Sequence, residues 1–189
     1  MIKLAVGITT AGSLKTQTAF ALYRLLKQPS YECEFLFKEG CLIHLNREIL
    51  AEQAIKAGCS HLLFVDSDMY FEKDAAQKLL ERDKDIIGVH YNLRKFPLTT
   101  TVKIEAEKKK NIAKLAPDGL TTCNSLGTGF LLIKIAVFKM LQKPWFDFSR
   151  KDGEVFGEDY YFCEKAREAG YELWVDLSIP VKHIGDYLY

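Results

Sequence analysis

Predicted strands alternate with predicted helices through the first half of the chain, and this alternation limits the possible fold more than any other feature. Strands are expected at 2–8, 31–37, 62–65 and 85–89, with helices between them at 16–27, 42–57 and 72–82. Strand–helix–strand alternation predicts an α/β fold with a mostly parallel central sheet flanked by helices. At 189 residues, the chain is expected to form a single domain over 1–189.

The segment 42–57 is predicted to be the clearest helix. Its apolar residues form a continuous stripe, and Gly58 ends it. Asn46 and Arg47 lie off that stripe, near the start of the helix. Two interpretations of Arg47 stay open, a solvated helix face or a contact with a bound nucleotide. The stripe consists of Leu42, Leu45, Ile49, Leu50, Ala54 and Ala57.

Two carboxylates, Asp66 and Asp68, follow the apolar run at 62–65. In open α/β sheets, ligands bind at the carboxyl ends of the strands. Residues two apart along an extended chain project to the same side, so both carboxylates can face one object. Like charges that close repel unless a cation lies between them, and Mg²⁺ or Mn²⁺ takes carboxylate oxygens together with substrate phosphates. The pattern favours a metal–diphosphate site, although a polar turn after a strand also explains it.

Two further loops carry candidate ligand contacts. Thr9 and Thr10 follow the first predicted strand, where hydroxyl and backbone groups can hold a nucleotide base or ribose, and a plain turn is the alternative. Gly127-Thr128-Gly129 precedes an apolar strand. Glycines there let a ligand or another backbone come close, and a glycine bulge explains them equally well.

The segment 157–170 is predicted to be a helix that begins with Glu158 and Asp159. Acids in a first turn are favoured by the helix dipole, which is the purely structural explanation. A carboxylate flanked by aromatic residues beside a cleft is also a good general base, because partial desolvation raises its pKa toward neutrality. Further on, His183 either offers a ring nitrogen to a metal or is inert.

Composition excludes some classes of function. A formal net charge of +1 gives no basis for non-specific binding to nucleic acid or to an anionic membrane. No apolar run approaches the roughly 20 residues that span a bilayer. The first residues indicate a strand rather than a signal peptide. The 5 cysteines are scattered without a Cys-x-x-Cys pair, which favours a reducing compartment, so we expect a cytoplasmic protein.

Taken together, these motifs resemble those of the GT-A glycosyltransferases, in particular the family 2-like branch. The resemblance spans nearly the whole chain and is weakest over 95–123. The Asn46-Arg47 pair, on the helix before the two carboxylates, is also similar to that family. The motifs that carry the resemblance are, in chain order, Asp66-Ser67-Asp68, Gly127-Thr128-Gly129-Phe130, Gly157-Glu158-Asp159 and His183.

The resemblance implies a GT-A, Rossmann-like domain that transfers a sugar from a nucleotide-sugar donor to an acceptor hydroxyl with inversion. The donor is expected to be a UDP-sugar, and the acceptor a glycan, lipid or protein. Residues 1–100 would bind the donor and residues 101–189 the acceptor. The cofactor would be Mn²⁺ or Mg²⁺, whose charge stabilises the departing diphosphate.

The resemblance also implies a role for each candidate residue. Asp68 and His183 would bind the metal, and Asp66 would contact the metal or the ribose. Asp159 would deprotonate the acceptor hydroxyl, with Glu158 as the second candidate. Donor contacts are expected from Thr9, Thr10, Arg47, Asp66 and Ser67, and acceptor contacts from Gly127, Thr128 and Gly129.

Three alternative functions differ from a glycosyltransferase in the residues that they need. A sugar-phosphate nucleotidyltransferase would need a glycine-rich first loop with nearby Arg and Lys, which Thr9-Thr10-Ala11-Gly12 does not supply. In a haloacid-dehalogenase-type phosphatase the two aspartates would end the first strand and precede Thr or Val, whereas here Met69 follows after two earlier strands. A non-catalytic nucleotide-sugar or glycan-binding module of the same fold would keep the pocket and need no base, and it stays open.

Overall fold

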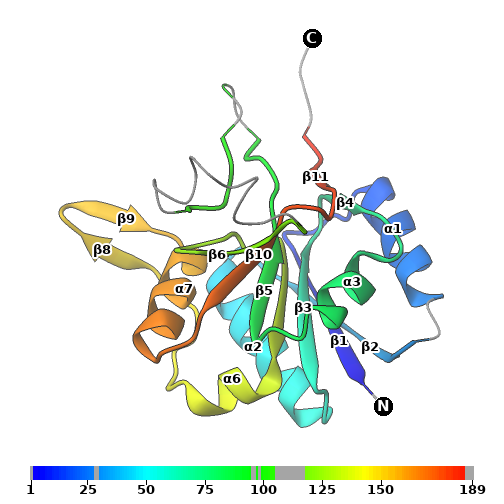
Figure 1. Cartoon of the computed structure of the whole chain (residues 1–189), viewed down its shortest axis with the longest axis horizontal. Helices are drawn as coiled ribbons and strands as arrows, with labels where there is room; N and C mark the ends of the chain where they lie inside the picture. Colours follow the sequence, from blue (N-terminus) through cyan, green and yellow to red (C-terminus); the bar gives the residue numbers. More distant parts are fainter. Residues whose placement is uncertain (1, 28–29, 95–96, 98, 105–117, 186–189) are drawn as a thin grey trace.

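A mixed seven-stranded sheet forms the centre of the molecule (Figure 1). The computed structural model describes residues 2–27, 30–94, 97, 99–104 and 118–185. All strands of the sheet run in one direction except β7 and β6, which are antiparallel to their neighbours. In spatial order the strands are β2 (Glu32–Glu39), β1 (Lys3–Thr10), β3 (His61–Asp66), β7 (Phe130–Lys134), β5 (Ile86–Val89), β10 (Leu173–Asp176) and β6 (Leu120–Cys123).

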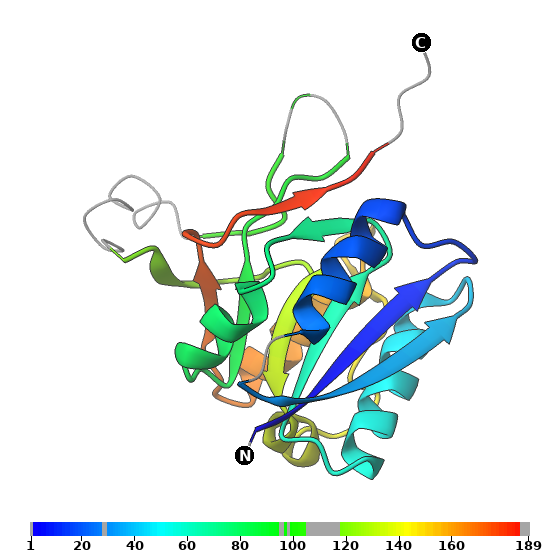
Figure 2. The ribbon, with the colours of Figure 1, turned by 90° about the vertical axis from the view of Figure 1, so that its right-hand side faces the viewer.

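Helices cover both faces of this sheet, as Figure 2 shows from the side of β1 and β2. In β3, Leu62 and Phe64 face one helical layer, and Leu63 and Val65 face the other. All four side chains are fully buried, which is why the run had to be apolar on both sides. The predicted α/β fold with a mostly parallel sheet is confirmed. One face packs against α2 (Ile43–Lys56), α6 (Ile135–Met140) and α7 (Glu158–Glu168), and the other against α1 (Thr16–Leu26) and α3 (Ala75–Glu81).

The antiparallel strand β7 lies between β3 and β5, where simple alternation would place a parallel strand. Val65 at the end of β3 pairs with Phe130 at the start of β7. Asp66 N–H donates to the carbonyl oxygen of Gly129 at 3.0 Å. The reversed direction of β7 therefore brings the segment before it to the carboxyl end of β3.

Two short strands that the sequence did not predict bring the ends of the site together. β4 (Met69–Phe71) pairs antiparallel with β11 (Val181–His183), with His183 opposite Met69. Ile184 N–H also donates to the carbonyl oxygen of Asp68 at 2.8 Å. Because β4 occupies 69–71, the helix expected at 72–82 begins only at Ala75.

The apolar stripe predicted for 42–57 is wrong at its start. Leu42 is 57% exposed and Leu45 45% exposed, whereas Asn46 and Arg47 are buried. Both side chains have partners that make their burial possible: Asn46 Nδ2 donates to the carbonyl oxygen of Gly40 at 2.8 Å, and Arg47 forms ion pairs through Nε and Nη2. Arg47 Nη1 is buried without a hydrogen-bond partner in the described part of the chain. The first turns of α2 therefore serve the site rather than the apolar core.

The hairpin predicted for 101–123 lies largely in 105–117, outside the described residues. A different hairpin, β8 (Ser149–Lys151) and β9 (Glu154–Phe156), projects from the molecule (Figure 1). Asp152 and Gly153 connect its strands with φ values of 52° and 83°. An Asp-Gly pair is the usual signal for this turn, so the hairpin could have been predicted. Among the described residues, no helix is long and apolar enough to cross a membrane.

Candidate active site

A cavity of about 300 Å³ opens where β1, β2 and β3 end. The carboxyl edge of parallel strands is the expected place for a ligand, because chain segments that leave neighbouring strands converge there. The site residues predicted from 9–10, 66–68 and 183 all lie in its wall. The lining residues are Thr9, Thr10, Ala11, Gly40, Cys41, Ile43, Asn46, Asp66, Ser67, Asp68, Arg94 and His183.

Asp66 is held from within the protein. Its Oδ1 accepts hydrogen bonds from Thr9 Oγ1 and from Arg47 Nη2, both at 2.9 Å. The Thr10 hydroxyl is also engaged, because it donates to the carbonyl oxygen of Ser13 and accepts from the Ser13 N–H. Thr9 thus positions Asp66, and Thr10 positions the loop after β1. This wall of the cavity is therefore already ordered without a ligand.

Arg47 lies behind Asp66 rather than on a solvated helix face. Its side chain is 1% exposed, and its Nε donates to Glu158 Oε1 at 3.1 Å. Burial alone would lower the pKa of Arg47, but the carboxylates of Asp66 and Glu158 outweigh that effect and raise it. The guanidinium therefore stays charged and joins the end of β3 to the start of α7. The donor contact predicted for Arg47 stays a prediction, and Arg47 is not among the residues that line the cavity.

Asp68 and His183 face each other across the β4–β11 ribbon, with Asp68 Oδ1 3.3 Å from His183 Nε2. His183 Nδ1 lies 3.2 Å from the carbonyl oxygen of Asn92. A carbonyl oxygen can only accept, so Nδ1 is the donor and Nε2 is left to face Asp68. The hydrogen bond to Asp68 raises the pKa of His183. Burial opposes ionisation of Asp68, but His183 and Arg94 outweigh it and lower the pKa of Asp68.

The chemistry of this pair fits a divalent cation. A neutral imidazole whose Nδ1–H is held by a carbonyl group presents its Nε2 lone pair, which is the usual arrangement around ligating histidines. A metal ion would therefore take the place of the proton that Nε2 shares with Asp68. Asp68 adds a carboxylate oxygen on the same side. No group of three or more His, Cys, Asp or Glu side chains gathers as a metal site within the described residues. Asp68 and His183 would therefore supply part of the coordination, with diphosphate oxygens and water completing it.

Asp159 stands at the first turn of α7, next to Glu158. Its carboxyl group is partly buried, and burial together with the adjacent negative charge of Glu158 raises its pKa. The two acids differ in their surroundings. Glu158 is bound to Arg47, whereas Asp159 Oδ1 accepts only the N–H of Tyr160 among the hydrogen bonds of the described chain. Asp159 is therefore the more available proton acceptor of the two.

The glycines of the segment 127–129 leave room for a tyrosine. Gly129 N–H donates to Tyr91 Oη at 2.8 Å, and a Cβ at Gly127 would lie 2.4 Å from the same oxygen. Gly127, Thr128 and Gly129 are all buried. The Tyr91 hydroxyl occupies the space beside Gly127 and Gly129, so the acceptor contact stays a prediction.

The close packing against Tyr91 gives a testable expectation for stability. Gly127→Ala should lower the free energy of unfolding by about 1–3 kcal/mol, because the added methyl group overlaps the Tyr91 hydroxyl. Tyr91→Phe alone should also be destabilising, because it removes the acceptor of the buried Gly129 N–H. The double variant should therefore lose less than the sum of the two single losses, since one oxygen causes both. Urea denaturation of the two single variants and the double variant checks this. Ala19→Gly on the exposed side of α1 is the control, because it changes the unfolding free energy through the backbone alone. Gly153→Ala is unsuitable, since Gly153 has a positive φ that strains alanine. An unchanged Gly127→Ala variant would show that Tyr91 yields freely.

No protein-family model matches this sequence, and neither does any curated protein sequence. Solved structures are similar to it. A197 from STIV has a TM-score of 0.68 and 19% identity, with 98% of this chain and 87% of that chain covered. GalNAc-T7, crystallised with UDP, GalNAc and Mn²⁺, has a TM-score of 0.58 and 12% identity, with 98% and 44% covered. The inositol-1-phosphate CTP transferase from T. maritima has a TM-score of 0.54 and 10% identity, with 97% and 89% covered.

The chain has the GT-A fold. At identities this low the likeness shows the fold and not the activity. Its neighbours include both a glycosyltransferase and a nucleotidyltransferase, so the fold by itself does not assign an activity to this chain.

Some residues of the GT-A-fold cavity were not predicted as site residues. Gly40 and Cys41 follow β2, and Asn46 holds Gly40 from α2. The rule that located Asp66 applies equally to the end of β2, so this loop could have been found from the strand predicted at 31–37. Arg94 pairs with Asp68 Oδ2 at 2.8 Å. From the sequence, Arg94 lies on a loop that leaves the carboxyl edge of the strand at 85–89 and could contact a sugar or diphosphate, but a solvated loop cation explains it equally well.

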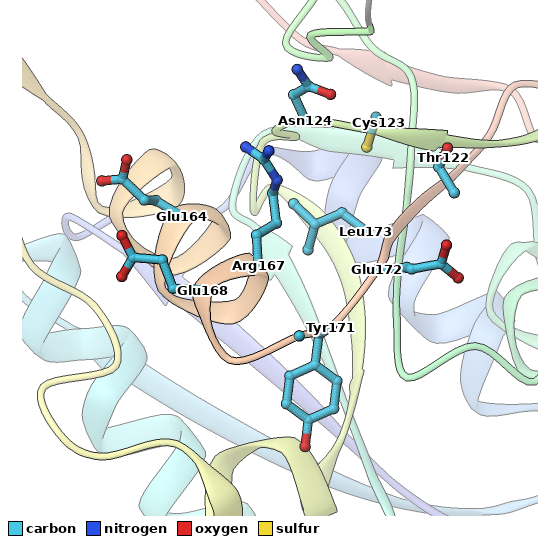
Figure 3. Close-up of a pocket in the computed structure, with 10 residues that line it drawn as sticks. Thr122, Cys123, Asn124, Glu164, Arg167, Glu168, Tyr171, Glu172 and Leu173 are labelled. Carbon is cyan, nitrogen blue, oxygen red and sulfur yellow. The ribbon is translucent and has the colours of Figure 1, made fainter.

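A second cavity, of about 490 Å³, lies elsewhere on the molecule (Figure 3). It is formed by β6, the end of α7 and the start of β10, so it lies at the amino end of a parallel strand. Figure 3 shows Arg167 pointing toward Asn124, with Glu164 and Glu168 directed away from it. This cavity contains none of the predicted site residues. The first cavity therefore remains the candidate active site.

Proposed function

We propose that the protein is a metal-dependent glycosyltransferase of the family 2-like branch, which transfers a sugar from a UDP-sugar to an acceptor hydroxyl with inversion. The observation that carries this proposal is the convergence of Asp66, Asp68 and His183 on one cavity at the carboxyl edge of the sheet. The partly buried Asp159 stands beside Glu158, which the Arg47 guanidinium joins to Asp66. Along the chain, Asp66 and Asp68 come before Asp159, the proposed base. This is the order of the motifs in the GT-A glycosyltransferases that the sequence resembles.

Residues 1–100 and His183 form the donor side in this proposal. Asp68 and His183 would hold Mn²⁺ or Mg²⁺, which when bound supplies positive charge for the departing diphosphate. Asp66, fixed by Thr9, would contact the ribose, and the loops at 9–11 and 40–41 would surround the base. Ser67 lies between the two aspartates and lines the same cavity. A preformed wall of this kind orients the donor before the acceptor arrives.

Residues 101–189 supply the base in this proposal. The raised pKa of Asp159 matches the need for a carboxylate that accepts a proton from a hydroxyl as the hydroxyl attacks the sugar. Attack from the side opposite the diphosphate inverts the anomeric carbon. Glu158 would act through Arg47 as a positioning residue rather than as the base. We also propose a cytoplasmic location, supported by the cysteine usage of the sequence.

A thermal-shift titration tests the donor site. UDP or a UDP-sugar with Mn²⁺ should stabilise the protein, and a ligand at about a hundred times its dissociation constant adds about 2.7 kcal/mol. Asp68→Ala should remove the metal-dependent part. Asp74→Ala, a change to an exposed acid that pairs with Lys78 on α3, should leave it intact. CTP and other nucleoside triphosphates belong in the same panel.

The possible outcomes separate the readings. A metal-dependent shift with UDP-sugars supports the glycosyltransferase. A shift with a nucleoside triphosphate and a sugar phosphate, followed by pyrophosphate release, would replace it with the nucleotidyltransferase. If no nucleotide shifted the melting temperature with metal present, the donor-site assignment would be wrong.

A further inference from the structure

β2 forms an open edge of the central sheet. Among the described strands, only β1 pairs with it. None of its 8 residues is buried, whereas β1 buries all but its first and last. An edge strand of this length presents a row of unpaired backbone groups that can accept a further strand. Figure 2 shows β2 at the margin of the sheet, beside β1.

The hydrogen bonds at the two ends of β2 show which of its residues face outward. Glu32 N–H donates to Ile2 O, and Gly40 N–H donates to Thr10 O, each at 3.0 Å. The backbone groups of successive residues in a strand point in alternate directions, so the even-numbered residues face β1. The residues with outward-facing N–H and C=O groups are therefore Cys33, Phe35, Phe37 and Glu39.

We propose that two copies of this chain associate through β2, in an antiparallel two-fold register centred on Leu36. In this register Phe35 of one copy lies opposite Phe37 of the other, and Cys33 lies opposite Glu39. These are the residues whose backbone groups face outward, so each pair can exchange both hydrogen bonds of an antiparallel ladder. A two-fold axis uses the same strand on both copies and closes the assembly as a dimer.

The side chains on β2 complement one another in this register. Glu34 lies opposite Lys38 on both sides of the axis. Within the described part of the chain, Lys38 forms no ion pair, and Glu34 has only a contact of 3.8 Å with Lys3 Nζ. On the other face Phe37, which is 53% exposed, lies opposite Phe35. Opposite charges and aromatic rings are the cross-strand pairs that stabilise antiparallel strands.

Neighbouring registers lose this complementarity. A two-fold axis on Phe35 would set Glu34 against Leu36, and an axis on Phe37 would set it against Gly40. An axis between two residues would pair outward-facing backbone groups with inward-facing ones, which breaks the ladder. The register centred on Leu36 is therefore the one that this sequence favours.

Charge reversal on the full-length chain tests the proposal by sedimentation velocity over a range of concentrations. The wild type should show a monomer–dimer equilibrium. Lys38→Glu sets two carboxylates against each other at each site, and Glu34→Lys sets two ammonium groups together, so each change should weaken the dimer about tenfold or more. Lys139→Glu on the exposed face of α6 is the matched control and should leave it unchanged.

Mixing the two single variants gives the decisive result. Glu34→Lys and Lys38→Glu chains have complementary charges at both sites, so a heterodimer should form more tightly than either homodimer. The double variant Glu34→Lys with Lys38→Glu should likewise dimerise like the wild type. Circular dichroism confirms that each variant is folded. A wild type that stays monomeric at all concentrations, a dimer unaffected by Lys38→Glu, or a mixture without heterodimer would each overturn the proposal.

Discussion

Asp159→Asn is expected to lower the rate of sugar transfer by about 10²–10⁴-fold while leaving donor affinity unchanged. Asparagine keeps the shape of the side chain and its ability to accept the Tyr160 N–H, but it cannot take a proton from the acceptor hydroxyl. Donor affinity should persist, because Asp66, Asp68 and His183 line a cavity that does not include Asp159. Transfer rates and donor titrations on the same preparation check the two halves of this expectation.

The pH profile adds a readout that a merely structural role would not give. Burial and Glu158 raise the pKa of Asp159, so kcat/KM should fall as the pH decreases through that raised value, above the range of an ordinary aspartate. Arg47 opposes the shift, and Tyr91 and Cys163 also interact electrostatically with Asp159. Glu158→Gln removes a cause of the shift, so the acidic limb should move to lower pH.

A control and a contrary result are both available on α7. Glu168→Gln, at the exposed end of the same helix, should change neither rate nor profile. If Asp159→Asn transferred sugar at the wild-type rate, another group would be the base. If neither the wild type nor Asp159→Asn transferred sugar, and both bound the donor equally well, the protein would match the non-catalytic binding module.

The sequence predicted well which residues meet at the cavity on the carboxyl edge of the sheet, because that part depends on local patterns. The apolar run 62–65 had to be buried on both faces, and a buried parallel strand followed by Asp66 and Asp68 places two acids at the ligand edge. The residue pattern left His183 as either a metal ligand or an inert residue, and only the resemblance assigned it to the site. The pairing of β4 with β11 brings it there, and these two strands are more than a hundred residues apart in the sequence. Each strand has only three residues, which is too short an apolar pattern to predict a strand.

The arrangement around Gly127 and Gly129, where acceptor contacts were predicted, was harder to foresee, because it depends on packing between distant segments. Gly127 and Gly129 indicated a close approach, but the sequence could not tell a ligand from the Tyr91 ring that fills the space. The antiparallel direction of β7 has the same origin, since an apolar strand shows no direction in its composition. Arg47 is the clearest case, as its partner Glu158 is 111 residues away.

Arg47→Met is expected to lower the free energy of unfolding by about 3–5 kcal/mol at neutral pH. Methionine fills a similar volume, so the loss comes from leaving Glu158 and Asp66 without the charge that both contact. Adding Glu158→Gln should recover part of the loss, because the double variant no longer buries that carboxylate. The stability of Arg47→Lys should lie between those of the wild type and Arg47→Met. An ammonium group keeps the charge but lacks the forked guanidinium that reaches both acids.

Arg24 offers the matched comparison that separates burial from ion pairing. Arg24 Nη2 lies 2.9 Å from Glu72 Oε2, the same distance as Arg47 Nη2 from Asp66 Oδ1, but its side chain is 28% exposed rather than 1%. An exposed pair contributes at most about 1 kcal/mol, because water replaces the lost partner. Urea denaturation should therefore show a small effect for Arg24→Met and a large one for Arg47→Met. Equal effects would mean that Asp66 and Glu158 are solvated when Arg47 is absent, and that the guanidinium does not hold β3 and α7 together.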